Sequence, residues 1–435
     1  MGLESDRRSS ESRFTEYVEG LTATLGHADR AGPFQSYCIG LLLPGSRKSV
    51  EPMAAQLEPA RVRATHQSLH HLVANADWSD EAMLAAIRQR VLPSIEQHGA
   101  IRAWIIDDTG IPKKGTHSVG VARQYCGQLG KQDNCQVAVS LSLANDYASL
   151  PIAYQLYLPE TWANDAARRD KAGVPDELVF QTKPQIALGQ IRSALQSGVS
   201  PAAVLADAGY GTDTEFRDGI TELGLRYVVG IQSSTSVWGP DTAPKPPKRW
   251  SGNGRPPKLI RRDAKHQPIS AKQLALALPK RKWHQVTWRE GSNTSLTSRF
   301  AAVRIRPAHR DYHRTSPRPE EWCLIEWPVE EAEPTKYWLA TLPANTSLSD
   351  LVNLAKLRWR IERDYQELKQ ELGLGHYEGR GWRGFHHHAS LTIAAYGFLI
   401  SERGAIPPSA ATQAPFRKTP RLPKGYRPRG SPNPT

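Results

Sequence analysis

Two short apolar segments, each ending in aspartate, constrain the fold of this chain more than any other feature of its sequence. The first is Arg102-Ala-Trp-Ile-Ile-Asp-Asp108, and the second is Ala202-Ala-Val-Leu-Ala-Asp207, which the turn Ala208-Gly-Tyr-Gly211 follows. Apolar runs of this length are typical of buried strands. Because an α/β sheet usually presents its functional site beyond the ends of its strands, both acids are candidates for a site there.

Strand and helix patterns surround these two segments. We expect strands at 136–143 and 150–158, a helix at about 183–196, a second helix at about 214–223 and a further strand at 226–230. Strands and helices that follow one another in this way predict a mixed α/β sheet with helices on both faces.

The charge of the chain favours a polyanionic partner. Its 435 residues carry a formal net charge of +13, and contacts between Lys or Arg and phosphates release condensed counterions. The sequence has no long apolar run and no basic amphipathic anchor, so a membrane partner is not expected. It also has no G-x-x-x-x-G-K-[ST] phosphate loop, so the use of ATP is not expected.

The cysteines and the N-terminal sequence predict a cytoplasmic protein. The four cysteines lie far apart with no C-x-x-C pair, which excludes a convincing zinc ribbon or a dense disulfide framework and suits a reducing compartment. They are Cys38, Cys126, Cys135 and Cys323. The N-terminus is polar and lacks the apolar core of a signal peptide, so we expect the chain to stay where it is made.

Composition and pattern divide the chain into five segments. Residues 1–98 are expected to be helical, either as a module that binds DNA ends or as an accessory packing domain. Residues 99–234 and 336–404 are the two parts of the predicted α/β core, and residues 235–335 are a β-rich insertion that contains a basic, Pro-rich connector. Residues 405–435, rich in Pro, Lys and Arg, bury too little apolar surface to fold and are expected to be disordered.

A long helix near the end of the core carries a third acid. Ser347–Asp350 resembles a capping box that begins the helix, and Gly373 is expected to end it. Arg358, Glu362 and Lys369 are spaced by four and then seven residues, so they share one helical face. Taken alone, the helix favours an exposed face with an Arg–Glu ion pair worth about 0.2–0.5 kcal/mol. The two acids at strand ends reverse that preference.

Asp108, Asp207 and Glu362 together indicate phosphoryl transfer. Two divalent ions about 3.5–4 Å apart need hard oxygen ligands from several elements, which three such acids supply. One ion would activate an attacking water or 3′-hydroxyl, and the other would stabilise the leaving oxygen. Arg358 and Lys369 would contact DNA phosphates beside the ions.

At these residues the sequence resembles the DDE insertion-sequence transposases, whose catalytic core is RNase H-like. Arg358-Trp-Arg-Ile-Glu362 and Lys369 match the R-x3-E-x6-K part of the Y-x2-R-x3-E-x6-K signature. Asp108-Thr109 resembles the first aspartate of the family, and Leu205-Ala-Asp207-Ala-Gly-Tyr-Gly211 resembles the second. The resemblance is greatest to the insertion sequence 701-type transposases and covers roughly residues 100–400.

The resemblance implies a DNA transposase with an RNase H-like mixed sheet flanked by helices. Two Mg²⁺ or Mn²⁺ ions held by Asp108, Asp207 and Glu362 would support cleavage of double-stranded DNA at the ends of a mobile element and strand transfer into target DNA. Synapsis of two ends implies a homodimer on DNA, associated with the nucleoid. One departure is Ala355, which stands where the signature has Tyr and lacks any phosphate contact that the Tyr makes.

Relatives with this signature form a DNA hairpin and flip a base against a tryptophan of the β-rich insertion. Stacking on an aromatic ring is a suitable way to hold an extruded base. Five tryptophans are candidates for this role, although any one of them is more often a core residue. They are Trp283, Trp288, Trp322, Trp327 and Trp338.

Asp107 competes with Asp108 for the first acidic position. Because side chains alternate along a strand, only one of the two should face the site. The resemblance favours Asp108 and leaves Asp107 as a neighbouring group.

Three other interpretations of the sequence remain. Asp108-Thr109-Gly110 also resembles the Asp-Thr-Gly of aspartic proteases, but no second copy occurs with which to share a proton. The run His386–His388 suggests a metal site, yet adjacent histidines on a helix point in different directions, which favours a solvated or DNA-facing cluster. A catalytically silent, transposase-derived DNA-binding protein is the main alternative to an enzyme, and the presence of all three acids argues against it.

Overall fold

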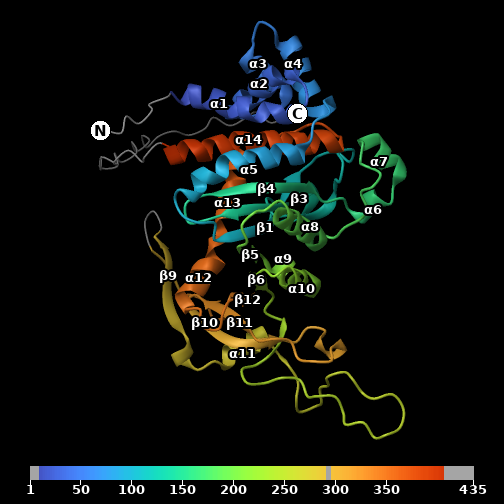
Figure 1. Cartoon of the computed structure of the whole chain (residues 1–435), viewed down its shortest axis with the longest axis vertical. Coiled ribbons are helices and arrows are strands. Elements are labelled where there is room, and N and C mark those ends of the chain that lie inside the picture. The colour runs from blue at the N-terminus through green and yellow to red at the C-terminus, as the bar shows by residue number, and fades with distance from the viewer. Residues whose placement is uncertain (1–8, 291–294, 406–435) are drawn as a thin grey trace, which may run out of the picture.

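The computed structural model describes residues 9–290 and 295–405, which form a central mixed sheet with helices on its faces (Figure 1). The twelve strands of this described part follow the order β2-β3-β1-β5-β6-β12-β11-β10-β7-β8, with β4 beside β3 and β9 beside β10. Their bounds are β1 Ala103–Pro112, β2 Ala122–Cys126, β3 Lys131–Ala144, β4 Ser149–Leu156, β5 Ala203–Ala206, β6 Tyr227–Ile231, β7 Ser236–Trp238, β8 Ile269–Ser270, β9 His284–Glu290, β10 Ser295–Pro307, β11 Glu321–Trp327 and β12 Lys336–Ala340. The predicted α/β class, a mixed sheet flanked by helices, is confirmed.

The first apolar segment forms the centre of the sheet. Strand β1 pairs antiparallel with β3 along its whole length and parallel with β5 at its start. Trp104, Ile105 and Ile106 are fully buried. Strands with helices over both faces have apolar residues on both sides, which explains the continuous apolar run that the sequence shows here.

The strands of residues 235–335 continue the same sheet instead of forming a separate one. Strand β12 pairs antiparallel with β6 on one side and with β11 on the other. Strand β11 then pairs with β10, and β10 with both β9 and β7. The strands of the α/β core and those of residues 235–335 therefore belong to one hydrogen-bonded sheet.

The helices that cover the sheet come from segments both before and after the first strand. The helices before the first strand are α1 Ser10–Thr22, α2 Ala31–Leu42, α3 Val50–Leu57, α4 Val62–His70 and α5 Asp80–Glu96. The later ones are α6 Glu160–Ala163, α7 Ala166–Ala172, α8 Lys183–Gln196, α9 Ala208–Gly211, α10 Thr214–Glu222, α11 Ala271–Ala277, α12 Leu348–Leu357, α13 Trp359–Gln366 and α14 Trp382–Ala405. Among the helices that the structure describes, none has both the length and the apolar character needed to cross a membrane.

Helix α14 joins the first helices of the chain to the sheet. It runs alongside α5, and both helices also contact β4 (Figure 1). The Tyr17 hydroxyl of α1 donates to the Ala394 carbonyl oxygen at 2.9 Å, and the rings of Phe14 and Phe398 lie 5.0 Å apart. Residues from the two ends of the chain therefore form one helical layer.

The single helix predicted to begin at Ser347 is interrupted. The Ser347 hydroxyl accepts the Asp350 backbone N–H at 3.1 Å, as expected of a cap, and Gly373 with a φ of +72° follows the last turn. Between these points, α12 ends before Arg358 and α13 begins after it, and a π-helical turn occupies Glu367–Glu371. The break places Arg358 at the junction of two helices.

The three consecutive histidines are buried, so the prediction of a solvated or DNA-facing cluster was wrong. The ring of His387 stacks on Trp78 with centroids 3.6 Å apart. His388 Nδ1 is bonded to the Tyr37 hydroxyl at 2.8 Å, and His386 Nε2 accepts the Leu156 backbone N–H at 3.2 Å. Because helix α14 is covered on several sides, three successive positions all contact neighbouring elements instead of solvent.

We predict that acid destabilises this packing. Burial lowers the pKa of both His387 and His388 to about 4, from an ordinary 6.5. The unfolded chain therefore binds protons between about pH 6.5 and pH 4 that the folded chain does not bind. The stability contributed by the neutral rings is complete above this window and falls as the pH decreases through it, by about 3 kcal/mol for each histidine.

Urea unfolding across that pH range measures the loss, and His387→Phe provides the comparison. Phenylalanine keeps a flat ring over Trp78 but removes one titrating group, so the free energy of unfolding should depend less steeply on pH in the variant. An equal pH dependence in the variant and the parent would contradict the explanation.

Candidate active site

Asp107 lies in β1, and Asp207 directly follows β5, the parallel strand beside it. The backbone register of β1 and β5 pairs Ile105 with Leu205. Asp107 stands two residues further along β1, and Asp207 stands two residues beyond Leu205, directly after β5 ends at Ala206. Because side chains alternate along a strand, Asp107 lies on the same face of β1 as Ile105, and Asp207 begins the turn that follows β5.

Helix α9 holds Asp207 in place. Asp207 is the N-cap of this helix, and its Oδ1 accepts the backbone N–H of Gly209 at 2.8 Å and that of Tyr210 at 3.4 Å. Gly211 lies directly against β6, since a Cβ there would stand 2.0 Å from the Gly230 carbonyl oxygen. The glycines of the turn after β5 therefore let α9 approach the sheet closely, and this approach fixes the position of Asp207.

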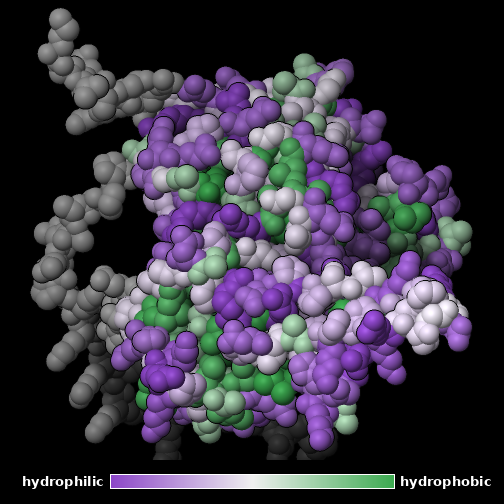
Figure 2. Space-filling view, turned by 60° about the horizontal axis from the view of Figure 1, so that its bottom comes forward, coloured by the Kyte–Doolittle hydropathy of each residue, from purple (hydrophilic) through white to green (hydrophobic). Residues whose placement is uncertain are grey.

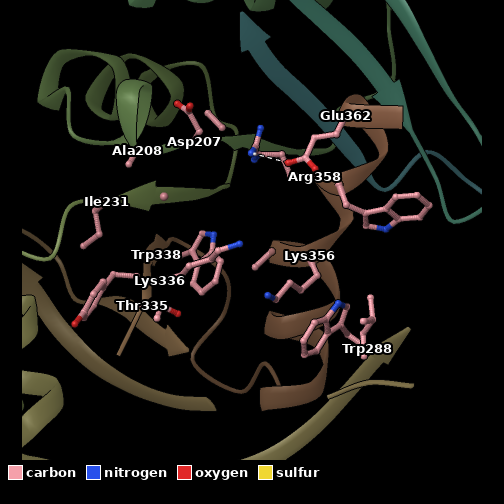
Figure 3. A pocket seen from close by; sticks show the side chains of 16 residues that line it. Asp207, Ala208, Ile231, Trp288, Thr335, Lys336, Trp338, Lys356, Arg358 and Glu362 are labelled. Atoms are coloured by element: carbon pink, nitrogen blue, oxygen red, sulfur yellow. Dashed lines mark hydrogen bonds and ion pairs between the residues drawn. The ribbon is translucent and has the colours of Figure 1, made fainter. Parts of the chain in front are cut away.

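Arg358 connects the strand acids with the helix acid. Its Nη1 lies 3.4 Å from Asp107 Oδ1. Its Nη2 lies 3.4 Å from Glu362 Oε1 (Figure 3). The Asp107 side chain is 14% exposed, whereas that of Glu362 is 68% exposed. One guanidinium thus lies between a largely buried carboxylate of β1 and an exposed carboxylate of α13.

Asp108 faces the opposite side of the sheet. Its Oδ2 forms a close ion pair with Nζ of Lys183, the first residue of α8. The neighbouring carboxylates therefore contact different helices: Asp108 contacts α8, and Asp107 contacts the junction of α12 and α13. This geometry favours Asp107 over Asp108 as the partner of Asp207 and Glu362. The choice between Asp107 and Asp108 depends on the register of β1 against β5, and a single sequence does not reveal this register.

Partly buried acids that lie near one another raise the free-energy cost of ionising each carboxyl group. Burial raises the pKa of Asp107 to about 7, Arg358 opposes this increase, and the charges of Asp108 and Asp207 add to it. The buried hydroxyl of Tyr210 has no hydrogen-bond partner among the described residues, and burial and the three aspartates raise its pKa. A cation close to these groups would relieve their mutual repulsion.

The residues fit a divalent ion in their chemistry but are not assembled around one. Carboxylate oxygens are the ligands that Mg²⁺ and Mn²⁺ prefer. Within residues 9–290 and 295–405, however, no three His, Cys, Asp or Glu side chains are arranged so that they could hold an ion. Glu362 is instead turned toward Arg358. A site containing Glu362 would require its side chain to leave that ion pair.

Lys369 reaches the same strand from the end of the helical segment. Its Nζ donates to the Gly110 carbonyl oxygen at 3.0 Å. Burial lowers the pKa of Lys369, and nearby Cys126, Asp107 and Asp108 only partly oppose this decrease. Both cations that the sequence assigns to DNA phosphates, Arg358 and Lys369, therefore lie beside the acidic end of β1.

A cavity of about 360 Å³ runs from the acids to a group of aromatic side chains (Figure 3). Asp207, Arg358 and Glu362 line one part of it, and Trp288 and Trp338 line another. Lys356 Nζ lies 4.2 Å from the centroid of the Trp288 ring and is paired with Glu326 at 2.7 Å.

The three other candidate tryptophans do not line this cavity. The ring of Trp283 packs edge-on against that of Trp327, with centroids 5.2 Å apart. The indole N–H of Trp322 donates to the Pro343 carbonyl oxygen at 3.0 Å. These side chains have structural contacts, which leaves Trp288 and Trp338 as the candidate tryptophans that line the cavity, beside Tyr337 and Trp359.

Comparison with known proteins gives two findings. Residues 20–295 match the family model described as DDE superfamily endonuclease. Over 172 residues the chain is 33% identical to the "Probable transposase for insertion sequence element IS701" of Microchaete diplosiphon, an alignment that covers 39% of this chain and 42% of that protein. The chain thus spans about two fifths of the length of this curated relative.

We predict that Gly211→Ala displaces α9 and with it Asp207. The added Cβ would meet the Gly230 carbonyl oxygen and lie 2.8 Å from Val229 Cβ, and backbone cannot yield as a flexible side chain does. Overpacking of this kind costs about 1–3 kcal/mol or more. Gly189→Ala in α8 is the matched control, because nothing lies within 4 Å of its Cβ and alanine favours a helix by about 0.5–1 kcal/mol. Urea unfolding of both variants checks this, and similar stabilities would contradict it.

Proposed function

We propose that this chain, which belongs to the DDE superfamily endonucleases, is a DNA transposase that cuts at the ends of a mobile element and joins the freed 3′-hydroxyls to target DNA. One observation carries the proposal. Asp107 of β1 and Glu362 of α13 lie on either side of Arg358, and Asp207, directly after the neighbouring parallel strand β5, lines the same cavity as Arg358 and Glu362. The likeness to a transposase over 172 residues supports the same activity.

Asp107, Asp207 and Glu362 are the proposed metal ligands, with Asp108 as the alternative first ligand. Two Mg²⁺ or Mn²⁺ ions would supply activation of the attacking oxygen and stabilisation of the leaving oxygen. The exposed ion pair between Arg358 and Glu362 is worth only about 0–1 kcal/mol, so little energy opposes the turn of Glu362 toward the aspartates.

Arg358 and Lys369 are proposed to hold the DNA strand. When Glu362 leaves Arg358, the guanidinium is able to form paired hydrogen bonds to a phosphodiester next to Asp107. Lys369 contacts β1 at the Gly110 carbonyl oxygen, two residues beyond Asp108. Together they would position the scissile phosphate without taking part in proton transfer.

The aromatic part of the cavity is proposed to hold an extruded base. Trp288 supplies a flat surface in the cavity wall, and Lys356, which is paired with Glu326, lies over its ring. Stacking of a base on an aromatic side chain is worth about 1–3 kcal/mol. Because two DNA ends must be joined, the active assembly is proposed to be a homodimer on double-stranded DNA.

We predict that Trp288→Ala lowers the occupancy of the extruded base. A DNA end carrying 2-aminopurine at the extruded position should lose fluorescence when its base stacks on the indole, and the variant should lose much of this quenching. Trp283→Ala, which removes an indole that packs on Trp327 instead, is the control. Equal quenching by the two variants would remove Trp288 from this role.

Three acid variants test the catalytic proposal. Asp107→Asn, Asp207→Asn and Glu362→Gln should each lower Mg²⁺-dependent nicking of a terminal-repeat duplex by about a thousandfold, since each removes about 4 kcal/mol of transition-state stabilisation. Asp108→Asn is the matched comparison, because Asp108 stands next to Asp107 but pairs with Lys183. It should retain most of the activity.

Two results would change the assignment. If Asp108→Asn abolishes nicking while Asp107→Asn retains it, Asp108 is the first ligand. If the parent binds the terminal repeat but cuts it with neither Mg²⁺ nor Mn²⁺, the chain is a DNA-binding protein without catalysis.

A further inference from the structure

The positive charge of the chain is concentrated in two segments. Residues 245–265 contain eight Lys or Arg and a single acid, Asp263, which gives a formal charge of +7. Residues 406–435 contain six Lys or Arg and no acid, and lie outside the described residues. These two segments account for the whole formal charge of +13, so the remainder of the chain is neutral. We call residues 245–265 the basic loop.

The outer part of the basic loop contributes nothing to the hydrophobic core. Every residue from 248 to 259 is exposed, and none lies in a helix or a strand. Its one side-chain hydrogen bond to its own backbone joins the Trp250 indole N–H to the Gly254 carbonyl oxygen at 3.1 Å. The loop extends away from the sheet, beyond α11, at the end of the molecule opposite the first helices (Figure 1). Folding alone therefore does not explain its composition.

The base of the loop, in contrast, is held firmly. Lys245 and Arg261 form two backbone hydrogen bonds with each other, both of 2.9 Å. Asp311, which is buried, accepts the indole N–H of Trp238 at 2.6 Å and pairs with Arg262. A rigid base presents the outer loop in a defined direction and lowers the entropy lost when it binds.

The outer loop has the chemistry of a phosphate-binding surface. Lys248, Arg249, Arg255 and Lys258 are exposed, and none of them makes an ion pair or hydrogen bond to another residue that the structure describes. Four such cations without an acid between them repel one another unless an anion neutralises them. Trp250, 50% exposed, adds an aromatic surface beside them. On the face in Figure 2, hydrophilic residues predominate and hydrophobic ones form separate patches.

We infer that the basic loop binds the phosphate backbone of duplex DNA outside the cavity that contains Asp207 and Glu362, independently of base sequence. This inference rests on the proposed function. The loop is on a different part of the chain from Arg358 and Lys369, which lie beside the acids. It therefore contributes to DNA affinity and not to cleavage of DNA that is already bound.

The experiment measures how salt weakens DNA binding. The full chain is titrated with a fluorescent duplex, without divalent ions, at several KCl concentrations. The loop variant replaces four residues together: Lys248→Gln, Arg249→Gln, Arg255→Gln and Lys258→Gln. The control variant replaces four exposed cations on other elements: Lys171→Gln, Arg192→Gln, Arg226→Gln and Lys280→Gln.

Four lost phosphate contacts should reduce the slope of log Kd against log salt by about 3.6. Between about 0.05 and 0.2 M KCl, the parent should therefore lose about a hundredfold more affinity than the loop variant. The control variant should keep most of the slope of the parent, and nicking at saturating DNA should be the same in the loop variant and the parent.

The possible failures are distinguishable. A loop variant with the slope of the parent overturns the inference, while nicking by the parent still supports the proposed function. A parent that neither binds nor nicks DNA overturns both. If the loop variant loses affinity for single-stranded DNA but not for the duplex, the loop is a single-strand site and the inference is wrong.

Discussion

The parallel pairing of β1 with β5 is the constraint on which the site depends. It aligns Ile105 with Leu205, so that two aspartates far apart in the sequence follow at matching positions. Helix α9 begins at one of them and fixes it through backbone N–H groups. Because the strands pair at their apolar residues, the acids are brought together despite their repulsion. The free energy gained by burying the apolar core offsets that repulsion.

In the same arrangement, the neighbouring carboxylates of Asp107 and Asp108 have different partners. Asp108 is neutralised by Lys183 on one side of the sheet, whereas Asp107 meets Arg358 on the other. Without its lysine, Asp108 would add another unpaired charge next to Asp107. Arg358 in turn stands where α12 gives way to α13, a position from which one guanidinium reaches both Asp107 and Glu362. The interruption of the helix at Arg358 therefore positions the guanidinium between Asp107 and Glu362.

Local features of the fold could be predicted from the sequence, and pairings between distant segments could not. The helix expected at about 183–196 is α8, and the two apolar strands are present because burial on both faces leaves an unmistakable pattern. The choice between Asp107 and Asp108 depends on the register of β1 against β5, which no local pattern encodes. The buried surroundings of His386–His388 come from α5, β4 and residues near Gly373, all distant in sequence.

A crystal structure of the chain with a DNA end and Mn²⁺ would test the central claim most directly, through anomalous scattering at the manganese edge. The account predicts two anomalous peaks among the carboxylates of Asp107, Asp207 and Glu362, with Glu362 turned away from Arg358 and the Asp108–Lys183 pair intact. Peaks held by Asp108, or no peak at the ends of β1 and β5, would contradict it.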